Sequence, residues 1–306
     1  MALLILMPGR DILEFVAHIR SARPDIDLRI WPDTGERTDI DFIVTWKHPP
    51  GALVQFPNVK AISSFGAGVD HILSDPALPR GVPIVRIIDD KLIHDLREYV
   101  IAVVLSHKRH LTEYEKNQST KKWEPIPMER ERTVGVLGLG RIGGAIAAGF
   151  AALGFRVCGW DRVPKKISGV QCFPEDRLDD LLRMADYLVC CLPLTPETKH
   201  ILNRKVFERM KHGAYVINVG RGDHLVEDDL VEAVEEGRLS GSCLDVFQTE
   251  PLAQDHPFWS HPKITVTPHI ASLTDPASAA EQVIENYQRV LDKRELVNTI
   301  DVRMGY

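Results

Sequence analysis

The sequence predicts an α/β protein with two doubly wound domains, each a mostly parallel sheet covered by helices. Its 306 residues exceed the size at which a single hydrophobic core usually keeps growing. Short β-rich apolar runs alternate with helical segments in two successive series, which is the pattern of parallel α/β sheets. A polar connector broken by prolines, residues 120–132, separates the two series.

The first series combines short strands with one clearly amphipathic helix. The segment 11–22 has helical spacing. The apolar side chains that share one face of it are Ile12, Phe15, Val16 and Ile19. Pro, Gly and Asp separate the strands, as is typical of turns. The expected strands span residues 3–7, 28–31, 42–46, 60–65 and 83–87.

Residues 89–118 contain neither proline nor glycine, and they predict a long helix that leaves the first domain. Its apolar positions follow a helical repeat: Leu92, Leu96, Val100, Val103 and Val104.

The second series begins at Thr133 and again alternates strands with helical segments. Its expected strands span residues 133–138, 155–161, 186–193, 214–220, 241–247 and 264–267. A final amphipathic helix over 278–291 adds no strand. We therefore expect one domain over residues 99–275, inserted into a second domain made of residues 1–98 and 276–306.

A glycine-rich turn opens the second series. Gly138, Gly140 and Gly143 form G-x-G-x-x-G directly after a strand and directly before an alanine-rich helix. The first glycine permits the tight turn, the second lets a pyrophosphate approach the backbone, and the third lets the helix pack closely on the strand. The N–H groups of the helix start attract phosphate, and Arg141 adds a positive charge next to Ile142. This context predicts a dinucleotide site in a Rossmann-type domain.

The acid after the next strand bears on which dinucleotide binds. Asp161 lies 18 residues beyond Gly143, where an acid accepts hydrogen bonds from the adenosine ribose and repels a 2′-phosphate, which favours NAD. Arg162, Lys165 and Lys166 follow at once, and cations there can hold a 2′-phosphate, so NADP stays open.

Polar side chains follow the later strands of this series at their carboxyl ends, where ligands bind in a doubly wound sheet. An apolar slot for adenine is expected at Leu192, Pro193 and Thr195. The ionisable groups at or just past three successive strand ends are Arg221, Asp245, Glu250 and His269. The other cofactor-binding candidates are Val219, Gly220 and Ser272. A lone histidine beside an apolar run is commonly a packed core residue, but its neighbours here favour a proton donor.

Three segments resemble the signatures of the D-isomer-specific 2-hydroxyacid dehydrogenases, and the likeness extends over most of the chain. They read GLGRIG at 138–143, INVGRG through DVFQTEPL at 217–252, and TPHIAS at 267–272. The segments SFGAGVDHIL, WKHPP and the ending VRMGY are similar to the glyoxylate/hydroxypyruvate reductase A branch of that family. The resemblance implies a Rossmann-type cofactor domain inserted in a flavodoxin-like substrate domain, and a homodimer.

The resemblance also implies residue roles. Arg221 would grip the substrate, Glu250 would orient the histidine, and His269 would give the proton. Asp245 would face the nicotinamide carboxamide. The backbone N–H groups of residues 67 and 68, Ala67 and Gly68, would bind the substrate carboxylate. Gly220 departs from the family pattern, in which Ala or Ser is usual at that position.

These assignments predict reduction of a small 2-keto acid, glyoxylate or hydroxypyruvate, by hydride transfer from NAD(P)H. Trp46 either walls the substrate site, which suits a short acid, or packs under a loop. The alternatives are a dehydrogenase of the same fold for a larger acid, of the D-lactate, phosphoglycerate or aryl-pyruvate type, and an NAD-sensing binding protein. The complete Arg, Glu and His set favours an enzyme.

Bulk composition narrows the partners and the compartment. The net charge of −6, without a long Lys/Arg run, argues against a nucleic-acid surface. The cysteines form no CxxC or CxxH pair, and Cys158, Cys190 and Cys191 lie in strand-like runs, as expected for reduced thiols in the cytoplasm. The N-terminal apolar run is too short for a membrane span and lacks a signal-peptide layout. No cluster has metal-ligand spacing, so no metal is expected.

Overall fold

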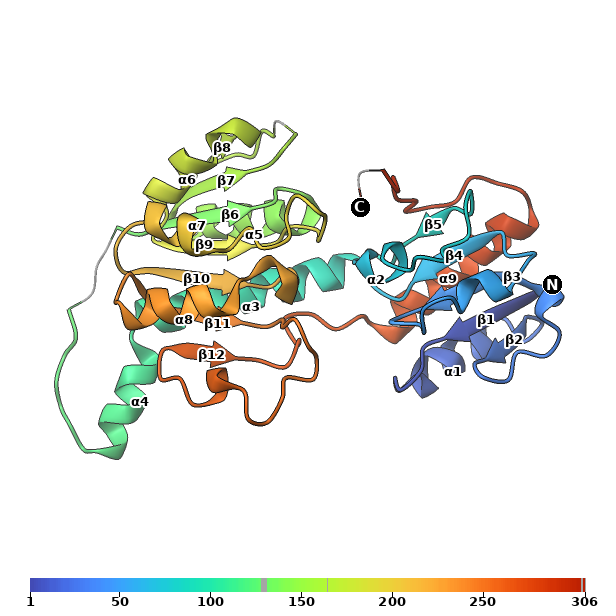
Figure 1. The fold of residues 1–306 in the computed structure, drawn as a ribbon, viewed down its shortest axis with the longest axis horizontal. Helices are drawn as coiled ribbons and strands as arrows, with labels where there is room; N and C mark the ends of the chain where they lie inside the picture. Colours follow the sequence, from blue (N-terminus) through green and yellow to red (C-terminus); the bar gives the residue numbers. More distant parts are fainter. Residues whose placement is uncertain (128–130, 164, 304, 306) are drawn as a thin grey trace. The chain divides into compact units, whose positions relative to one another are not determined.

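The computed structural model describes residues 1–127, 131–163, 165–303 and 305, and the chain forms two compact units (Figure 1). Unit 1 consists of Met1–Leu92 and Leu273–Tyr306, and unit 2 of Ile93–Ser272. The expected boundaries, after residues 98 and 275, lie a few residues further along the chain. Part of the VRMGY ending, residues 304 and 306, lies outside the described residues.

Unit 1 contains a five-stranded parallel sheet in the order β2-β1-β3-β4-β5, which is the flavodoxin-like order. Alternate residues of β1 enter different apolar clusters: Leu3 and Ile5 pack with residues of α1 and α9, and Leu4 packs on the other face. Its strands and helices are β1 (Ala2–Leu6), α1 (Leu13–Ala22), β2 (Asp27–Ile30), β3 (Ile40–Thr45), β4 (Ala61–Ser64), α2 (Asp70–Leu73), β5 (Ile84–Val85) and α9 (Pro276–Leu291).

Unit 2 contains a seven-stranded parallel sheet in the order β12-β11-β10-β9-β6-β7-β8, which extends the Rossmann order by one strand. The strand order reverses between β6 and β9. Helix α3 (Asp90–Lys108) starts in unit 1 and continues into unit 2. The elements of unit 2 are α4 (Leu111–Ser119), β6 (Thr133–Leu137), α5 (Arg141–Ala152), β7 (Arg156–Trp160), β8 (Val170–Phe173), α6 (Leu178–Met184), β9 (Tyr187–Cys190), α7 (Arg204–Arg209), β10 (Ala214–Asn218), α8 (Glu227–Glu235), β11 (Leu239–Leu244) and β12 (Ile264–Val266).

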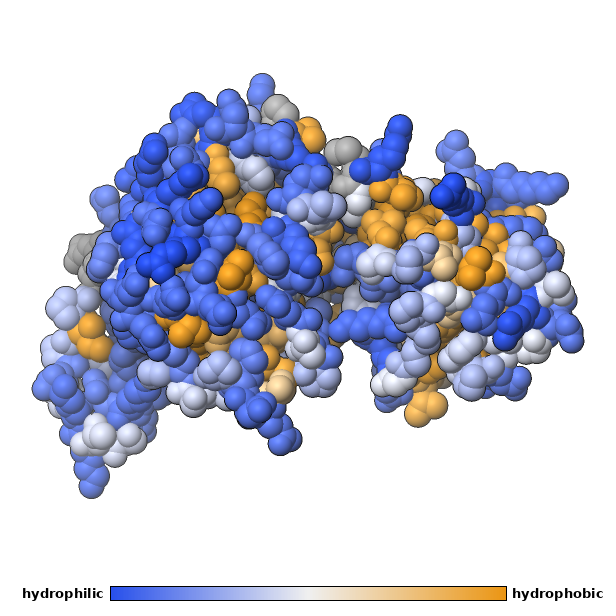
Figure 2. All heavy atoms as spheres, in the orientation of Figure 1, coloured by the Kyte–Doolittle hydropathy of each residue, from blue (hydrophilic) through white to orange (hydrophobic). Residues whose placement is uncertain are grey.

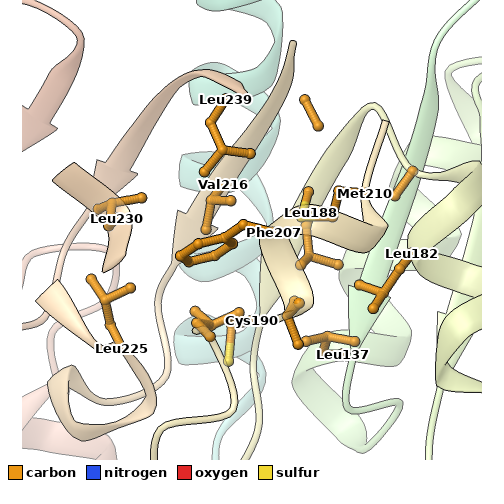
Figure 3. Packing of buried hydrophobic residues seen from close by; sticks show 14 of the residues in the cluster. Leu137, Leu182, Leu188, Cys190, Phe207, Met210, Val216, Leu225, Leu230 and Leu239 are labelled. Carbon is orange, nitrogen blue, oxygen red and sulfur yellow. The ribbon is translucent and has the colours of Figure 1, made fainter. Parts of the chain in front are cut away.

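Both faces of the seven-stranded sheet are buried. In β9, Tyr187 and Val189 join the cluster that contains α3 and α5 residues, whereas Leu188 and Cys190 join the cluster on the opposite face. Figure 3 shows the latter cluster, where Phe207 of α7 lies among residues from the sheet and α8. On the face drawn in Figure 2, unit 2 is covered mainly by hydrophilic residues. The predicted pair of doubly wound domains is therefore confirmed.

The prediction of one long helix over residues 89–118 is wrong in one respect. The segment forms two helices, α3 and α4. His110 lies at the break with a φ of 55°, in the left-handed region that a right-handed helix cannot contain. No proline or glycine marks this site, so local sequence signals do not reveal it. Helix α4 buries none of its residues and extends away from the sheet of unit 2 (Figure 1).

Strand β8 was not expected. It forms the edge of the sheet, and Phe173 is its buried residue, so its sequence lacks a continuous apolar run or a clear alternation. Strand β8 pairs with β7 along Val157 to Trp160. It therefore adds one strand to the sheet on the side of β7 away from β6. Among the described residues, no helix is both long and apolar enough to cross a membrane.

Candidate active site

The turn between β6 and α5 has the geometry that its glycines predict. A Cβ on Gly143 would lie 1.8 Å from the carbonyl oxygen of Gly138, so only glycine lets the helix approach the strand this closely. Gly138 has a φ of +89°, in the region that favours glycine. Among the described residues, a Cβ on Gly140 would meet no atom within 4 Å, so packing against them does not require glycine there. Open space beside an exposed backbone fits a pyrophosphate bound from outside.

The start of α5 adds to this fit. Its N-cap residue is Gly140, which has no side chain to cap the first N–H groups of the helix. Those groups and the helix dipole suit an anion, and Arg141 is exposed at the first helical position, followed by the half-buried Ile142. The residues present therefore fit a dinucleotide.

Asp161, the acid after β7, organises two loops. One carboxylate oxygen accepts a hydrogen bond from the Leu139 N–H at 2.8 Å, and the other accepts one from the Val163 N–H at 2.9 Å. The carboxylate thus joins the glycine turn to the segment that carries Arg162 and Lys165. Both oxygens already have a protein donor, although each has further accepting capacity.

The loop after β9 is held by hydroxyl groups. The hydroxyl of Thr198 donates to the carbonyl of Pro193 at 2.7 Å and accepts from the N–H of Thr195 at 2.8 Å. Leu192 and Thr195 are buried, and Pro193 is half-buried. Because β9 lies next to β6, this loop follows the strand adjacent to the glycine turn, as the predicted adenine slot requires.

The backbone of Arg221, which follows β10, is held at both of its polar atoms. Its N–H donates to Nδ1 of His224 at 3.0 Å, and its carbonyl accepts from the side-chain amide of Asn218 at 2.8 Å. The guanidinium donates to the carbonyl of Gly220 at 2.7 Å. The neighbouring candidate Val219 is half-buried and donates its N–H to the carbonyl of Cys190.

The segment after β10 packs tightly on the segment after β11. A Cβ on Gly222 would lie 1.9 Å from the carbonyl carbon of Phe247. The backbone of Gly222 and that of Phe247 are therefore in direct contact. The side-chain amide of Gln248 donates to the carbonyl of Leu225 at 2.9 Å. This contact brings the Arg221 segment next to the segment that carries Glu250.

Asp245 holds the turn that carries the candidate histidine. Its carboxylate is 1% exposed and accepts hydrogen bonds from the Thr267 hydroxyl at 2.6 Å, the Ile270 N–H at 2.9 Å and the Ala271 N–H at 2.8 Å. The acid predicted to face the nicotinamide carboxamide therefore makes three contacts with the protein.

His269 and Glu250 form a pair. Nδ1 of the ring lies 2.9 Å from one carboxylate oxygen of Glu250, and the other oxygen accepts the Phe247 N–H at 3.1 Å. The side chains are 35% and 19% exposed, respectively. His269 has a φ of 54°, in the left-handed region that histidine enters more often than most residues do. Nε2 is the ring nitrogen left for a ligand.

The structure thus brings Arg221, Glu250, Asp245 and His269 to the carboxyl ends of three adjacent strands. Ser272 has a buried hydroxyl with no hydrogen-bond partner in the described part of the chain, which suits a ligand amide. Residues that the sequence reasoning missed are Asn218, His224 and Thr267. In the sequence, His224 is a histidine within the segment RGDHLV, and no local pattern around it indicates a role.

The substrate candidates Trp46, Ala67 and Gly68 belong to unit 1. The Trp46 ring covers the backbone of Gly66, where an added Cβ would lie 2.8 Å from a ring carbon. The guanidinium of Arg10 lies 5.4 Å from the Trp46 ring centroid, and burial lowers the pKa of Arg10. No group of three or more His, Cys, Asp or Glu in the described ranges is arranged to hold a metal.

The chain is similar to known proteins over nearly its whole length. Residues 101–271 match the family model described as D-isomer specific 2-hydroxyacid dehydrogenase, NAD binding domain. The chain is 38% identical to the glyoxylate/hydroxypyruvate reductase A of Yersinia enterocolitica, over 98% of each protein.

Among solved structures, the chain is similar to an NADPH-dependent glyoxylate/hydroxypyruvate reductase from Sinorhizobium meliloti in complex with NADP and sulfate. The TM-score is 0.93 at 34% identity, over 100% of this chain and 99% of that chain. A D-isomer specific 2-hydroxyacid dehydrogenase from Xanthobacter autotrophicus, in complex with NADPH and MES, matches with the same TM-score, identity and coverage.

Proposed function

Because this chain belongs to the D-isomer specific 2-hydroxyacid dehydrogenase family, we propose that it reduces a short 2-keto acid, glyoxylate or hydroxypyruvate, with NADPH. Membership confirms the resemblance of its motifs and makes the protein an NAD(P)H-dependent oxidoreductase. The observation that carries the proposal is the His269–Glu250 pair, which follows β11 and β12 beside Arg221.

When bound, a nicotinamide cofactor would supply the hydride for the carbonyl carbon of the keto acid. We assign the proton for the carbonyl oxygen to Nε2 of His269, because Nδ1 is engaged by Glu250. The carboxylate holds the ring in one orientation, and imidazole is the side chain best suited to proton transfer near neutral pH. Glu250 is itself fixed by the N–H of Phe247, so the donor is oriented before substrate binds.

Arg221 is the proposed clamp for the substrate carboxylate and carbonyl. A planar guanidinium can bind two oxygens at once and stabilises the negative charge that develops as hydride arrives. For unit 1, we propose that the backbone N–H groups of Ala67 and Gly68 bind a carboxylate. The half-buried cation of Arg10 beside Trp46 favours an acid as ligand, and the ring over Gly66 favours a small one.

The residues after β7 bear on whether the cofactor is NADPH or NADH. Asp161 favoured NAD in the sequence, but its oxygens already bind the N–H groups of Leu139 and Val163. Arg162 and Lys165 directly follow and suit a 2′-phosphate. The relatives from Sinorhizobium meliloti and Xanthobacter autotrophicus hold NADP and NADPH. These observations support NADPH over NADH.

We further propose that the protein is a homodimer that uses the α4 arm, which we define as residues 111–127. Trp123 is 99% exposed, and Leu111 and Tyr114 are also exposed, so the arm carries apolar side chains that a second copy would cover.

We also propose a cytoplasmic location, which is supported by the five cysteines, because all of them are free thiols. Burial raises the pKa of the thiols of Cys158 and Cys190 to about 12.

The test is oxidation of NADPH and of NADH, each measured with glyoxylate, hydroxypyruvate, pyruvate and phenylpyruvate. We expect the highest kcat/KM with NADPH and one of the first two acids. Oxidation with none of the acids would overturn the proposed activity. A preference for phenylpyruvate would overturn the small-substrate assignment, and a preference for NADH would overturn the assignment of Arg162 and Lys165.

A further inference from the structure

We propose that His224 is a positioning residue of this site, which links the cofactor loop after β9 to the backbone of Arg221. The inference rests on the proposed function, because it assigns meaning to the alignment of Arg221. His224 ends a short 3-10 turn, Gly222–His224, and is 0% exposed. A fully buried imidazole needs partners for both of its ring nitrogens.

The contacts of the ring define its proton. The N–H of Arg221 points at Nδ1 at 3.0 Å, and a backbone N–H can only donate, so Nδ1 carries no proton. Nε2 lies 3.3 Å from the carbonyl oxygen of Pro193, which can only accept, so Nε2 carries the proton. The neutral Nε2–H tautomer satisfies both contacts, whereas a protonated ring would oppose the N–H of Arg221 with a second donor.

The same residue also holds the other side of the Arg221 peptide. The N–H of His224 donates to the carbonyl of Arg221 at 3.2 Å, next to the amide of Asn218. The carbonyl of His224 accepts the N–H of Leu202 at 2.8 Å, which anchors the turn to the segment before α7. Arg221 has a long side chain, so a small rotation of its backbone moves the guanidinium by a larger distance. The ring of His224 limits that rotation.

The glycine before Arg221 belongs to this arrangement. A Cβ on Gly220 would lie 2.9 Å from Nδ1 and Cε1 of His224, closer than side chains normally pack. A side chain at position 220 would therefore require the ring or the backbone to shift, and the imidazole packs against the α-carbon of Gly220.

The ring of His224 therefore contacts the segments proposed to bind two different ligands. Pro193 belongs to the loop proposed to hold the cofactor, and Arg221 is the proposed clamp of the keto acid. One buried ring touches both segments, so loss of each hydrogen bond should affect a different ligand. Loss of the Nδ1 bond should weaken keto-acid binding, and loss of the Nε2 bond should weaken cofactor binding.

The variants His224→Asn and His224→Gln separate the two bonds. The Asn oxygen can take the place of Nδ1 and still accept from Arg221, whereas the Gln amide can take the place of Nε2 and still donate to Pro193. We expect His224→Gln to raise KM for the keto acid by about 10- to 100-fold with little change in the Kd of NADPH. We expect His224→Asn to raise the Kd of NADPH by roughly 5- to 20-fold with a KM within about threefold of wild type.

His224→Leu removes both bonds at similar volume and should show both effects. Thermal unfolding of all variants, measured with the kinetics well below Tm, separates positioning from packing. Equal loss of Tm in the three variants with unchanged KM and Kd would reduce His224 to a packing residue. Identical KM and Kd changes for Asn and Gln would overturn the division of the two bonds.

A measurement that does not depend on turnover completes the test. In ¹⁵N-histidine NMR of the wild-type protein, Nδ1 of His224, assigned by its loss in His224→Gln, should resonate as an unprotonated nitrogen between about pH 6 and 8. A protonated Nδ1 in that range would overturn the proposal. Failure of the wild type to reduce any keto acid would instead count against the proposed function, since the NMR and NADPH results stand without it.

Discussion

His107 and His269 lie at opposite ends of the strands of unit 2. The ring of His107, in α3, lies 4.0 Å from the ring centroid of Tyr215, and its Nδ1 lies 3.1 Å from the hydroxyl of Tyr187. These tyrosines stand where β9 and β10 begin. His269 instead follows the end of β12 and lies 2.9 Å from Glu250. One histidine packs on aromatic rings, and the other faces a carboxylate.

The difference separates a packed histidine from the histidine that we propose as the proton donor. Burial lowers the pKa of His107 to about 4, so its ring stays neutral near pH 7. His269 is partly exposed, and its ring contacts the carboxylate of Glu250. The amino ends of the strands therefore hold a neutral packed ring, whereas the carboxyl ends hold the pair to which we assign proton transfer.

Replacement of His269 should have the largest effect. His269→Ala removes the proposed proton donor, and we expect kcat to fall by about 10²- to 10⁴-fold. The Kd of NADPH should stay within about twofold, because the glycine turn is unchanged. His107→Asn is the matched control and should leave kcat within about threefold. Steady-state kinetics of both variants decide the question, and a mild effect of His269→Ala would remove the contrast between the two ends.

Asp245 tests whether the carboxyl edge depends on a buried acid. Asp245→Ala leaves the N–H groups of Ile270 and Ala271 without their acceptor and should cost about 2–5 kcal/mol in the free energy of unfolding. Because the freed turn carries His269, kcat should fall as well. Asp228→Ala, at an exposed position in the first turn of α8, is the control; it should cost less than about 1 kcal/mol and leave kcat unchanged. Urea unfolding and initial rates report both, and a stable, fully active Asp245→Ala would contradict the assignment.

Acid unfolding tests the amino edge. The pKa of His107 is about 6.5 when unfolded and about 4 when folded, so protonation favours the unfolded chain. The stabilisation is complete above pH 6.5 and is lost as the pH falls through 4, up to about 3 kcal/mol. His107→Asn keeps an amide beside Tyr187 but does not titrate. The difference between wild-type and variant stability should therefore shrink as pH falls; a constant difference from pH 7 to pH 4 would refute this.

Two glycine variants give the smallest expected effect. Gly140→Ala should leave Tm nearly unchanged, because its Cβ meets no protein atom within 4 Å, but it should raise the Kd of NADPH by roughly 10-fold. Gly143→Ala should instead lower stability by about 1–3 kcal/mol or more, because its Cβ would overlap the carbonyl of Gly138. Tm and NADPH fluorescence titration distinguish them. Tight NADPH binding by Gly140→Ala would argue against a pyrophosphate at this turn.

Much of the fold could be predicted from the sequence because both sheets are regular. Alternating β-rich and helical segments predicted all the central strands, since buried parallel strands are continuous apolar runs. The exceptions were β8 and the break at His110. An edge strand has little burial to shape its sequence, and a left-handed residue without glycine leaves no local signal.

The candidate site was readable where a residue type has a strong chemical meaning. Arg221, Glu250 and His269 follow strand ends and match family motifs, so they were named from the sequence. The hydrogen bonds that align them were not. His224 and Pro193 are 31 positions apart, and Asp245 and Ile270 are 25 apart. No local pattern relates residues at such separations.

The sequence by itself determined the alternation of elements, the glycine turn and the identity of the groups to which we assign the reaction. These depend on backbone periodicity, on the lack of a Cβ and on side-chain chemistry, which are local properties. The tertiary structure alone decided that Asp161 and Asp245 bind backbone N–H groups and that one buried ring joins Pro193 to Arg221. Those contacts depend on the strand order, which brings the end of β6 next to that of β7 and the ends of β9 to β12 next to one another.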